Sequence, residues 1–179
     1  MQVSPVFSQF NPIKPVLAPQ KKLEQCEMVQ EFFRTFELPD EKSNHARFDE
    51  NLAAKIASYK EKAVIPVISS LKSANDEKEI TAGLFLLNRV IDAGAKGVEA
   101  QYHAISRFNY NESPNIQVML AGIYRKTQVP DGFGPLLSMF WHNAQNPITK
   151  PFDPNEEVGG AILEYLRNSA AGAVYRQSA

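Results

Sequence analysis

One pattern of side chains occurs three times in this chain and constrains its fold more than any other feature. Each copy has apolar or aromatic residues at relative positions 0, 4 and 7 and an arginine at position 9. Positions 0, 4 and 7 lie on one side of an α-helix, so each copy predicts an amphipathic helix. The copies are Ile80, Leu84, Leu87 and Arg89; Ile116, Leu120, Ile123 and Arg125; and Val158, Ile162, Tyr165 and Arg167.

A shorter apolar pattern precedes each copy and predicts a partner helix for it. Its pairs are Ile68 and Leu71, Ile105 and Phe108, and Leu137 and Phe140. The predicted helical hairpins cover residues 21–59, 63–92, 98–127 and 133–171. The three later second helices begin 36 and 42 residues apart, and repeats of that length are typical of solenoids. We therefore predict an all-α fold, an α-solenoid of about four antiparallel helical hairpins.

Capping residues predict where the repeated helices begin. Asp76 has Glu79 three residues later, which is the spacing of a capping box. Ser113 and Asp153 are each followed by proline, a pair typical of a helix start. The predicted helices run over residues 77–92, 114–127 and 154–171, and Gly94 and Gly97 end the first of them.

The first hairpin is predicted as helices over residues 21–36 and 45–59. Leu23, Cys26, Val29, Phe33 and Phe36 fall on one side of the first helix. Cys26 is expected to be a small buried hydrophobe rather than a reactive thiol. A third helix around residues 64–71 contains Pro66, and the pattern leaves open whether it is separate from the second.

The two ends of the chain differ in composition from the predicted helical domain, residues 21–171. Residues 1–20 contain four prolines, which disfavour helix, and are predicted to form an extended or disordered arm. This arm also carries Phe7, Phe10 and Ile13, so it is too apolar for a purely solvating tail. Residues 172–179 are predicted to be a frayed tail.

Length, charge and cysteine content limit the class of protein. A chain of 179 residues with a formal net charge of −1 has the size of one domain and no general attraction to nucleic acid or anionic membrane. The single cysteine excludes an intrachain disulfide. No run of 18 apolar residues predicts a membrane span, and the start lacks the usual design of a signal peptide. Cytoplasmic localisation is the resulting expectation.

The segment VIPVISSLKSANDEKEITAGLFLLNRVIDAG, residues 64–94, resembles a HEAT or armadillo-type repeat. It has a proline in the first helix, an apolar run, a short polar turn and a second helix rich in Ala, Gly and Leu. The resemblance extends over residues 61–171 and implies a HEAT-like fold. The chain departs from the family because the usual acidic residue and arginine between the helices are missing from its units, and the connection at 143–152 is too long.

Position 9 lies about 180° around the helix from position 0, which turns the arginines away from the core. Stacking of the units would align Arg89, Arg125 and Arg167 on the face lined by the second helices, which is usually concave in HEAT-like proteins. The alternative is that each arginine compensates the helix dipole at a C-terminus, worth about 0.3–1 kcal/mol.

Small and apolar residues lie at similar angles to these arginines and predict a covered surface. They are Ala82 and Phe85, Val118 and Ala121, and Gly160 and Leu163. The cover is either the N-terminal arm or another protein. Glycines inside the predicted helices destabilise them, so close approach of neighbouring helices is expected there. They are Gly83, Gly122, Gly159 and Gly160.

The chain carries no motif for catalysis, a cofactor or a metal. The three histidines lack metal-ligand spacing, and no phosphate loop, nucleophile elbow or Cys-His pair is present. Trp141 opens the long connection and is expected either to be half-buried in the core or to contact a partner. We therefore predict no catalytic, cofactor-binding or metal-binding residue.

The predicted function is a protein-interaction module that binds an extended or acidic peptide on the face of the second helices. Its predicted binding residues are Phe85, Arg89, Tyr124, Arg125, Trp141 and Arg167. One alternative is a HEAT-like enzyme or DNA-binding protein resembling the alkyl-base DNA glycosylases, which the near-neutral charge disfavours. Another is a structural subunit of a homo-oligomer, with a large apolar interface. Broad positive charge with a buried acid would favour DNA chemistry, and a mixed apolar groove would favour peptide binding.

Overall fold

The computed structural model describes residues 19–39, 43, 45–149 and 152–168. The predicted arm and tail therefore lie almost entirely outside the described residues. Within these ranges the chain forms eight α-helices and two short 3-10 helices, so the prediction of an all-α fold is confirmed there. The α-helices are α1 (Pro19–Thr35), α2 (Glu50–Ser58), α3 (Glu61–Ser73), α4 (Glu77–Asp92), α5 (Tyr102–Ser106), α6 (Pro114–Thr127), α7 (Phe133–Gln145) and α8 (Asn155–Asn168). The 3-10 helices are η1 (Glu99–Gln101) and η2 (Pro130–Gly132).

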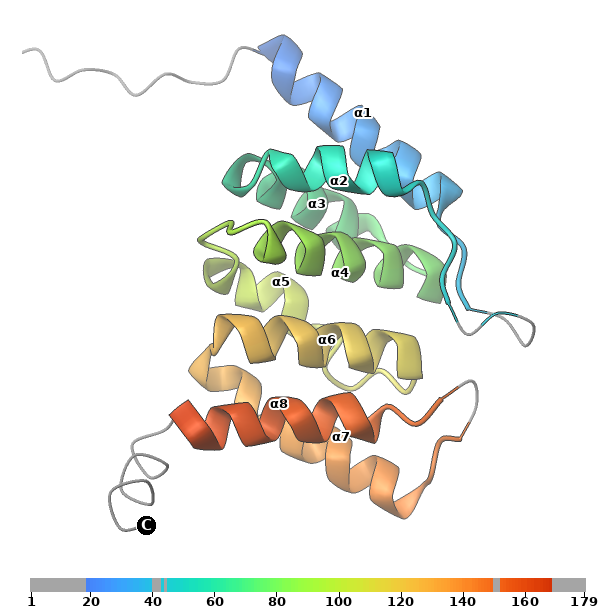
Figure 1. The fold of residues 1–179 in the computed structure, drawn as a ribbon, viewed down its shortest axis with the longest axis vertical. Helices are drawn as coiled ribbons and strands as arrows, with labels where there is room; N and C mark the ends of the chain where they lie inside the picture. Colours follow the sequence, from blue (N-terminus) through green and yellow to red (C-terminus); the bar gives the residue numbers. More distant parts are fainter. Residues whose placement is uncertain (1–18, 40–42, 44, 150–151, 169–179) are drawn as a thin grey trace, which may run out of the picture.

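The helices form two layers. Helices α2, α4, α6 and α8 lie side by side in a front layer, and α3, α5 and α7 lie behind them (Figure 1). In the front layer, α4 packs against both α2 and α6, and α6 packs against α8. Helix α3 packs against α4, and α7 packs against α8. Helix α1 contacts α2, α3 and α4 at one end of the two layers. This arrangement is compatible with a helical repeat fold.

The repeated apolar positions supply the core between the layers. Leu84 of α4 and Leu120 of α6 are both completely buried. Ile162 is only partly buried and packs against the core, because α8 has a front-layer neighbour on one side only among the described helices. The predicted inward stripe is therefore complete in α4 and α6 and partly exposed in α8.

Asp76 and Ser113 begin α4 and α6 as predicted, whereas α8 begins at Asn155, one residue after the predicted start. Asp76 Oδ1 accepts a hydrogen bond from the Glu79 backbone at 2.7 Å, and Glu79 Oε2 accepts one from the Asn75 backbone at 3.1 Å. Ser113 Oγ accepts from the Ile116 backbone at 3.4 Å. Each bond satisfies a backbone N–H that has no partner within its helix.

Two predicted helices are shorter in the structure. The second was predicted from residue 45 but begins at Glu50, with Asp49 as its cap. Glu37 and Arg47 exchange backbone hydrogen bonds at 2.8 and 3.0 Å, and this pairing keeps Arg47 out of the helix. The helix predicted at 98–109 is replaced by η1 and α5. Lys60, which has a positive φ of 50° and a ψ of −125°, separates α2 from α3.

No α-helix in the described part of the chain is both long and apolar enough to cross a membrane.

Candidate functional site

A groove runs along the front layer between α4 and α6. It consists of two adjoining cavities of about 310 and 300 Å³ that share four lining side chains, those of Phe48, Phe85, Val118 and Met119. We call this feature the α4–α6 groove. The cavity of about 310 Å³ is called the apolar end of the groove. The cavity of about 300 Å³ is called the charged end.

Phe85 stands at the centre of the groove within a cluster of phenylalanines. Its ring centroid lies 4.5 Å from that of Phe48, 5.8 Å from Phe36 and 6.0 Å from Phe32. These separations are typical of stabilising aromatic pairs. Phe36 and Phe48 flank the connection from α1 to α2, so this part of the chain itself supplies some of the cover expected over α4.

The apolar end contains one buried polar group without a partner. Thr81 is 3% exposed and lines the cavity, and its Oγ1 has no hydrogen-bond partner among the described residues. Asn115 also lines this end, and its side chain donates to Glu77 Oε1 at 2.9 Å. Thr81 Oγ1 is therefore a buried polar atom without a partner in the described part of the chain, and the side chain of His45 is a further polar group that lines this end.

The charged end carries three basic residues, and each has an acidic partner on a neighbouring helix. Each pair joins two front-layer helices, α2 to α4, α4 to α6 and α6 to α8. Exposed pairs of this kind contribute about 0.2–1 kcal/mol each. The pairs are Arg89 with Glu50, Lys126 with Asp92 at 2.8 Å, and Arg125 with Glu157 at 3.1 Å.

Asn88 fastens α4 to α6 beneath the charged end. Its Nδ2 donates to the backbone carbonyl of Met119 at 2.9 Å, and its Oδ1 accepts from Lys126 Nζ at 3.1 Å. The side chain of Asn88 fits because residue 122 is glycine: a β-carbon there would lie 2.7 Å from Asn88 Oδ1. Gly83 is constrained in the same way, since a β-carbon added at residue 83 would lie 2.5 Å from Leu71 Cγ. Close helix approach explains both glycines.

The structure brings three of the six predicted binding residues together. Phe85, Arg89 and Arg125 line the groove, and the Arg89 guanidinium carbon lies 5.5 Å from the Phe85 ring centroid. Trp141 lies on α7 in the back layer, is 64% exposed and does not line the groove. Arg167 is at the end of α8, where it pairs with Glu164 at 3.4 Å within the same helix.

Tyr124 does not lie on the groove surface, contrary to expectation. It is 1% exposed, and its hydroxyl donates to Asn109 Oδ1. Burial raises the pKa of Tyr124 well above its ordinary value. Tyr124 follows Ile116 by eight residues, which places it about 80° from that core position around the helix. The angle assigns it to the core stripe.

The sequence prediction missed several residues of the groove. Val118 was identified because it lies near Arg125 by helical angle. Thr81 was missed, although it lies one helical turn before Phe85, so its helical angle would have identified it. Phe48 comes from outside the repeated helices, and no periodicity relates it to α4. The other missed residues include Asn88, Met119 and Lys126 at the charged end and His45, Asn115 and Phe152 at the apolar end.

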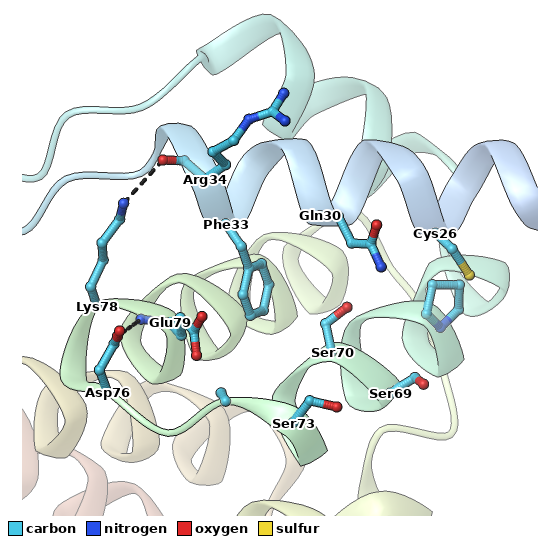
Figure 2. Close-up of a pocket in the computed structure, with 12 residues that line it drawn as sticks. Cys26, Gln30, Phe33, Arg34, Ser69, Ser70, Ser73, Asp76, Lys78 and Glu79 are labelled. Atoms are coloured by element: carbon cyan, nitrogen blue, oxygen red, sulfur yellow. Dashed lines mark hydrogen bonds between the residues drawn. The ribbon is translucent and has the colours of Figure 1, made fainter.

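A larger hollow of about 490 Å³ lies between α1, α3 and the start of α4 (Figure 2). Cys26 and Gln30 of α1 face three serines of α3 across it. Its carboxylates cap α4, and Lys78 donates to the Arg34 backbone carbonyl at 3.0 Å. None of its described lining residues is a histidine, so the serines and Cys26 have no neutral base to activate them.

Within the described residues, no three His, Cys, Asp or Glu side chains are grouped so that they could hold a metal ion. Comparison with protein-family models gives no match, and neither do comparisons with curated proteins and with solved structures. Function is therefore inferred from the geometry and chemistry of the chain itself.

Proposed function

We propose that this chain is a HEAT-like α-solenoid that acts as a protein-interaction module and binds an extended peptide segment of a partner protein in the α4–α6 groove. One observation carries the proposal: the two cavities adjoin and share four apolar side chains, and among the described lining residues Asp, Glu, Lys and Arg border one end only. An apolar floor with a few placed polar groups is typical of a binding site.

The dimensions of the groove suit a short extended segment. Thr81 and Asp92 mark its ends on α4, and eleven residues of helix are about 16 Å long. An extended chain advances about 3.3 Å per residue, so the groove accommodates about five residues. Each cavity has the volume at the lower end of the range for ligand sites.

The charge distribution favours a peptide over nucleic acid. Phosphate binding requires clustered Lys and Arg whose charge is available, whereas Arg89, Arg125 and Lys126 each have a carboxylate partner. A strongly acidic peptide would have to displace those carboxylates. An extended peptide with apolar side chains and few charges needs no such exchange.

The buried polar residues also support a binding module over the DNA-glycosylase alternative. In the described part of the chain they are Thr81 and carboxamides, with no carboxylate among them. A base-excising site of the kind considered above would use a buried acid within a positively charged groove.

The proposal is tested by selecting peptides from a random display library on the whole chain and mapping their contacts by NMR. The expected footprint consists of amide shifts at residues on both sides of the groove, such as Phe85 and Val118. Peptides whose shifts fall instead around Trp141, or a library that yields no specific binder, would contradict it.

A further inference from the structure

We propose that the outer face of α8 binds the same face of a second copy of this chain, with the two helices antiparallel. This surface is separate from the α4–α6 groove, so the inference goes beyond the proposed function and does not rest on it.

Helix α8 is the last helix of the front layer and packs against α6 and α7 (Figure 1). Its solvent side carries two exposed leucines, Leu163 at 54% and Leu166 at 47%. In stacks of helical units the terminal units normally have a polar outer face. The apolar outer face of α8 therefore indicates that another element covers it.

Four residues of this outer face form one stripe along the helix. They have relative positions 0, 4, 7 and 11, which lie within about 60° of one another and opposite the buried Val158. We call this set the α8 stripe. It consists of Glu156, Gly160, Leu163 and Arg167.

The α8 stripe is complementary to itself when a second copy is antiparallel. Residues at equal distances from the midpoint of the stripe, between residues 161 and 162, then face each other. Glu156 of each copy faces Arg167 of the other, and Leu163 of each copy faces Gly160 of the other. Such a self-complementary patch is what a two-fold homodimer requires. A parallel pair would place like charges opposite each other, so the charges select the antiparallel arrangement and a second copy as the occupant.

Gly160 supplies the space that Leu163 of the other copy needs. A glycine inside a helix destabilises it relative to alanine, and close contacts within the chain explain Gly83 and Gly122. By contrast, a β-carbon at residue 160 would lie 3.8 Å from Arg125 Nη1, which is an ordinary contact distance. Packing within the described chain does not require a glycine there, whereas the approach of a leucine from outside does.

Both charged residues of the stripe are exposed to solvent. Glu156 lies in the first turn of α8. The Arg167 side chain is 70% exposed, and its contact with Glu164 at 3.4 Å lies within the same helix. Exposed pairs of this kind are weak, so a second copy can compete for the arginine. Burial of the leucines drives the association, and the charges fix its orientation.

The test measures the mass of the full-length chain by analytical ultracentrifugation over a range of concentrations. The mass is expected to rise from that of one copy to that of two. Leu163→Asp is expected to weaken the association about tenfold or more, because it desolvates a carboxylate in an apolar contact. Leu23→Asp, which changes an exposed leucine of α1, is the matched control and should leave the association unchanged.

Charge reversals test the antiparallel pairing. Glu156→Arg and Arg167→Glu each place like charges opposite each other and are expected to weaken self-association roughly fivefold or more. An equimolar mixture of these two variants is expected to form dimers again, because each copy then carries the charges that the other requires. Circular dichroism establishes that each variant is folded.

Gly160→Leu distinguishes specific pairing from nonspecific association. The substitution adds apolar surface but fills the space for Leu163, so the inference predicts weaker dimers, whereas nonspecific association would become stronger. A chain that stays monomeric up to about 1 mM would overturn the inference. Association that Leu163→Asp leaves unchanged would overturn it too, as would charge variants whose mixture does not associate. Peptide binding in the groove of Leu163→Asp tests the proposed function alone.

Discussion

Gly122 and Asn88 form a matched pair between α6 and α4, because a β-carbon on residue 122 would lie 2.7 Å from Asn88 Oδ1. The glycine leaves room for the amide, and the amide bonds both the Met119 carbonyl and Lys126. This pair holds α4 and α6 together at the charged end of the groove, which both residues line.

Gly122→Ala is expected to destabilise the chain. Its β-carbon would displace the Asn88 side chain at a cost of about 1–3 kcal/mol, which exceeds the gain in helix propensity of about 1 kcal/mol. Thermal or urea unfolding followed by circular dichroism measures the change. In an Asn88→Ala background, Gly122→Ala should lower the free energy of unfolding much less.

Gly134→Ala is the matched control for that change. Gly134 also lies in a helix, but its added β-carbon meets nothing within 4 Å. This variant should be neutral or slightly stabilising. Equal unfolding curves for Gly122→Ala and Gly134→Ala would mean that the Asn88 contact does not constrain the helices.

Thr81→Val should stabilise the free chain. The substitution replaces a buried, unpartnered hydroxyl by a methyl group of similar shape, which removes a desolvation cost of about 1 kcal/mol. The expected rise in Tm is about 2–4 °C. Thr127→Val, which removes a hydroxyl that already bonds the Ile123 carbonyl, should not raise the Tm. A lower Tm for Thr81→Val would indicate that the hydroxyl has a partner in solution.

The arginines of the charged end are expected to stabilise the packing of neighbouring helices through their ion pairs. A double-mutant cycle with Arg125→Gln and Glu157→Gln is expected to give a coupling of about 0.2–1 kcal/mol, since both side chains are partly exposed. Raising the salt concentration to 1 M should reduce this coupling. The absence of coupling at low salt would show that Arg125 does not stabilise the chain through Glu157 and that its charge is available to a ligand.

Stability should fall at alkaline pH because of two tyrosines, Tyr124, which is buried, and Tyr165, which is partly buried. Burial raises the pKa of Tyr165 to about 12, and its hydroxyl donates to the Val129 carbonyl at 2.6 Å. Burial raises the pKa of Tyr124 in the same direction. The unfolded chain ionises these groups from about pH 10, before the folded chain does. The stabilisation is therefore fully present below pH 10 and is lost as the pH rises toward 12.

Urea titrations between pH 9 and pH 12 measure this loss. Tyr165→Phe should flatten the pH dependence, whereas replacing the exposed Tyr110 by Phe should leave it unchanged. An unchanged slope in Tyr165→Phe would show that this hydroxyl does not control alkaline unfolding.

Local features of the fold were predictable from sequence because they depend on neighbours along the chain. The caps at Asp76 and Ser113 act over three residues, and the buried positions Leu84 and Leu120 follow helical periodicity. Helix α2 was placed too early because its preceding residues pair with Glu37, a contact outside any local pattern.

The groove was only partly predictable because it is a tertiary feature. Phe85, Arg89 and Arg125 were identified by their helical angles, and the same angles should have excluded Tyr124. Phe48 lines the groove from outside the repeated helices, so periodicity does not place it there. That Thr81 lacks a partner depends on the surrounding side chains, so only coordinates could identify it.

The affinity of a library-selected groove peptide for two charge variants, measured by calorimetry, tests the central claim most directly. Val118→Asp places a carboxylate in the apolar floor of the groove, and Leu163→Asp makes the same type of change on the exposed surface of α8. The groove proposal predicts that Val118→Asp weakens binding about tenfold or more while Leu163→Asp leaves it unchanged. Equal affinity of the peptide for Val118→Asp and the unmodified chain would contradict the proposal.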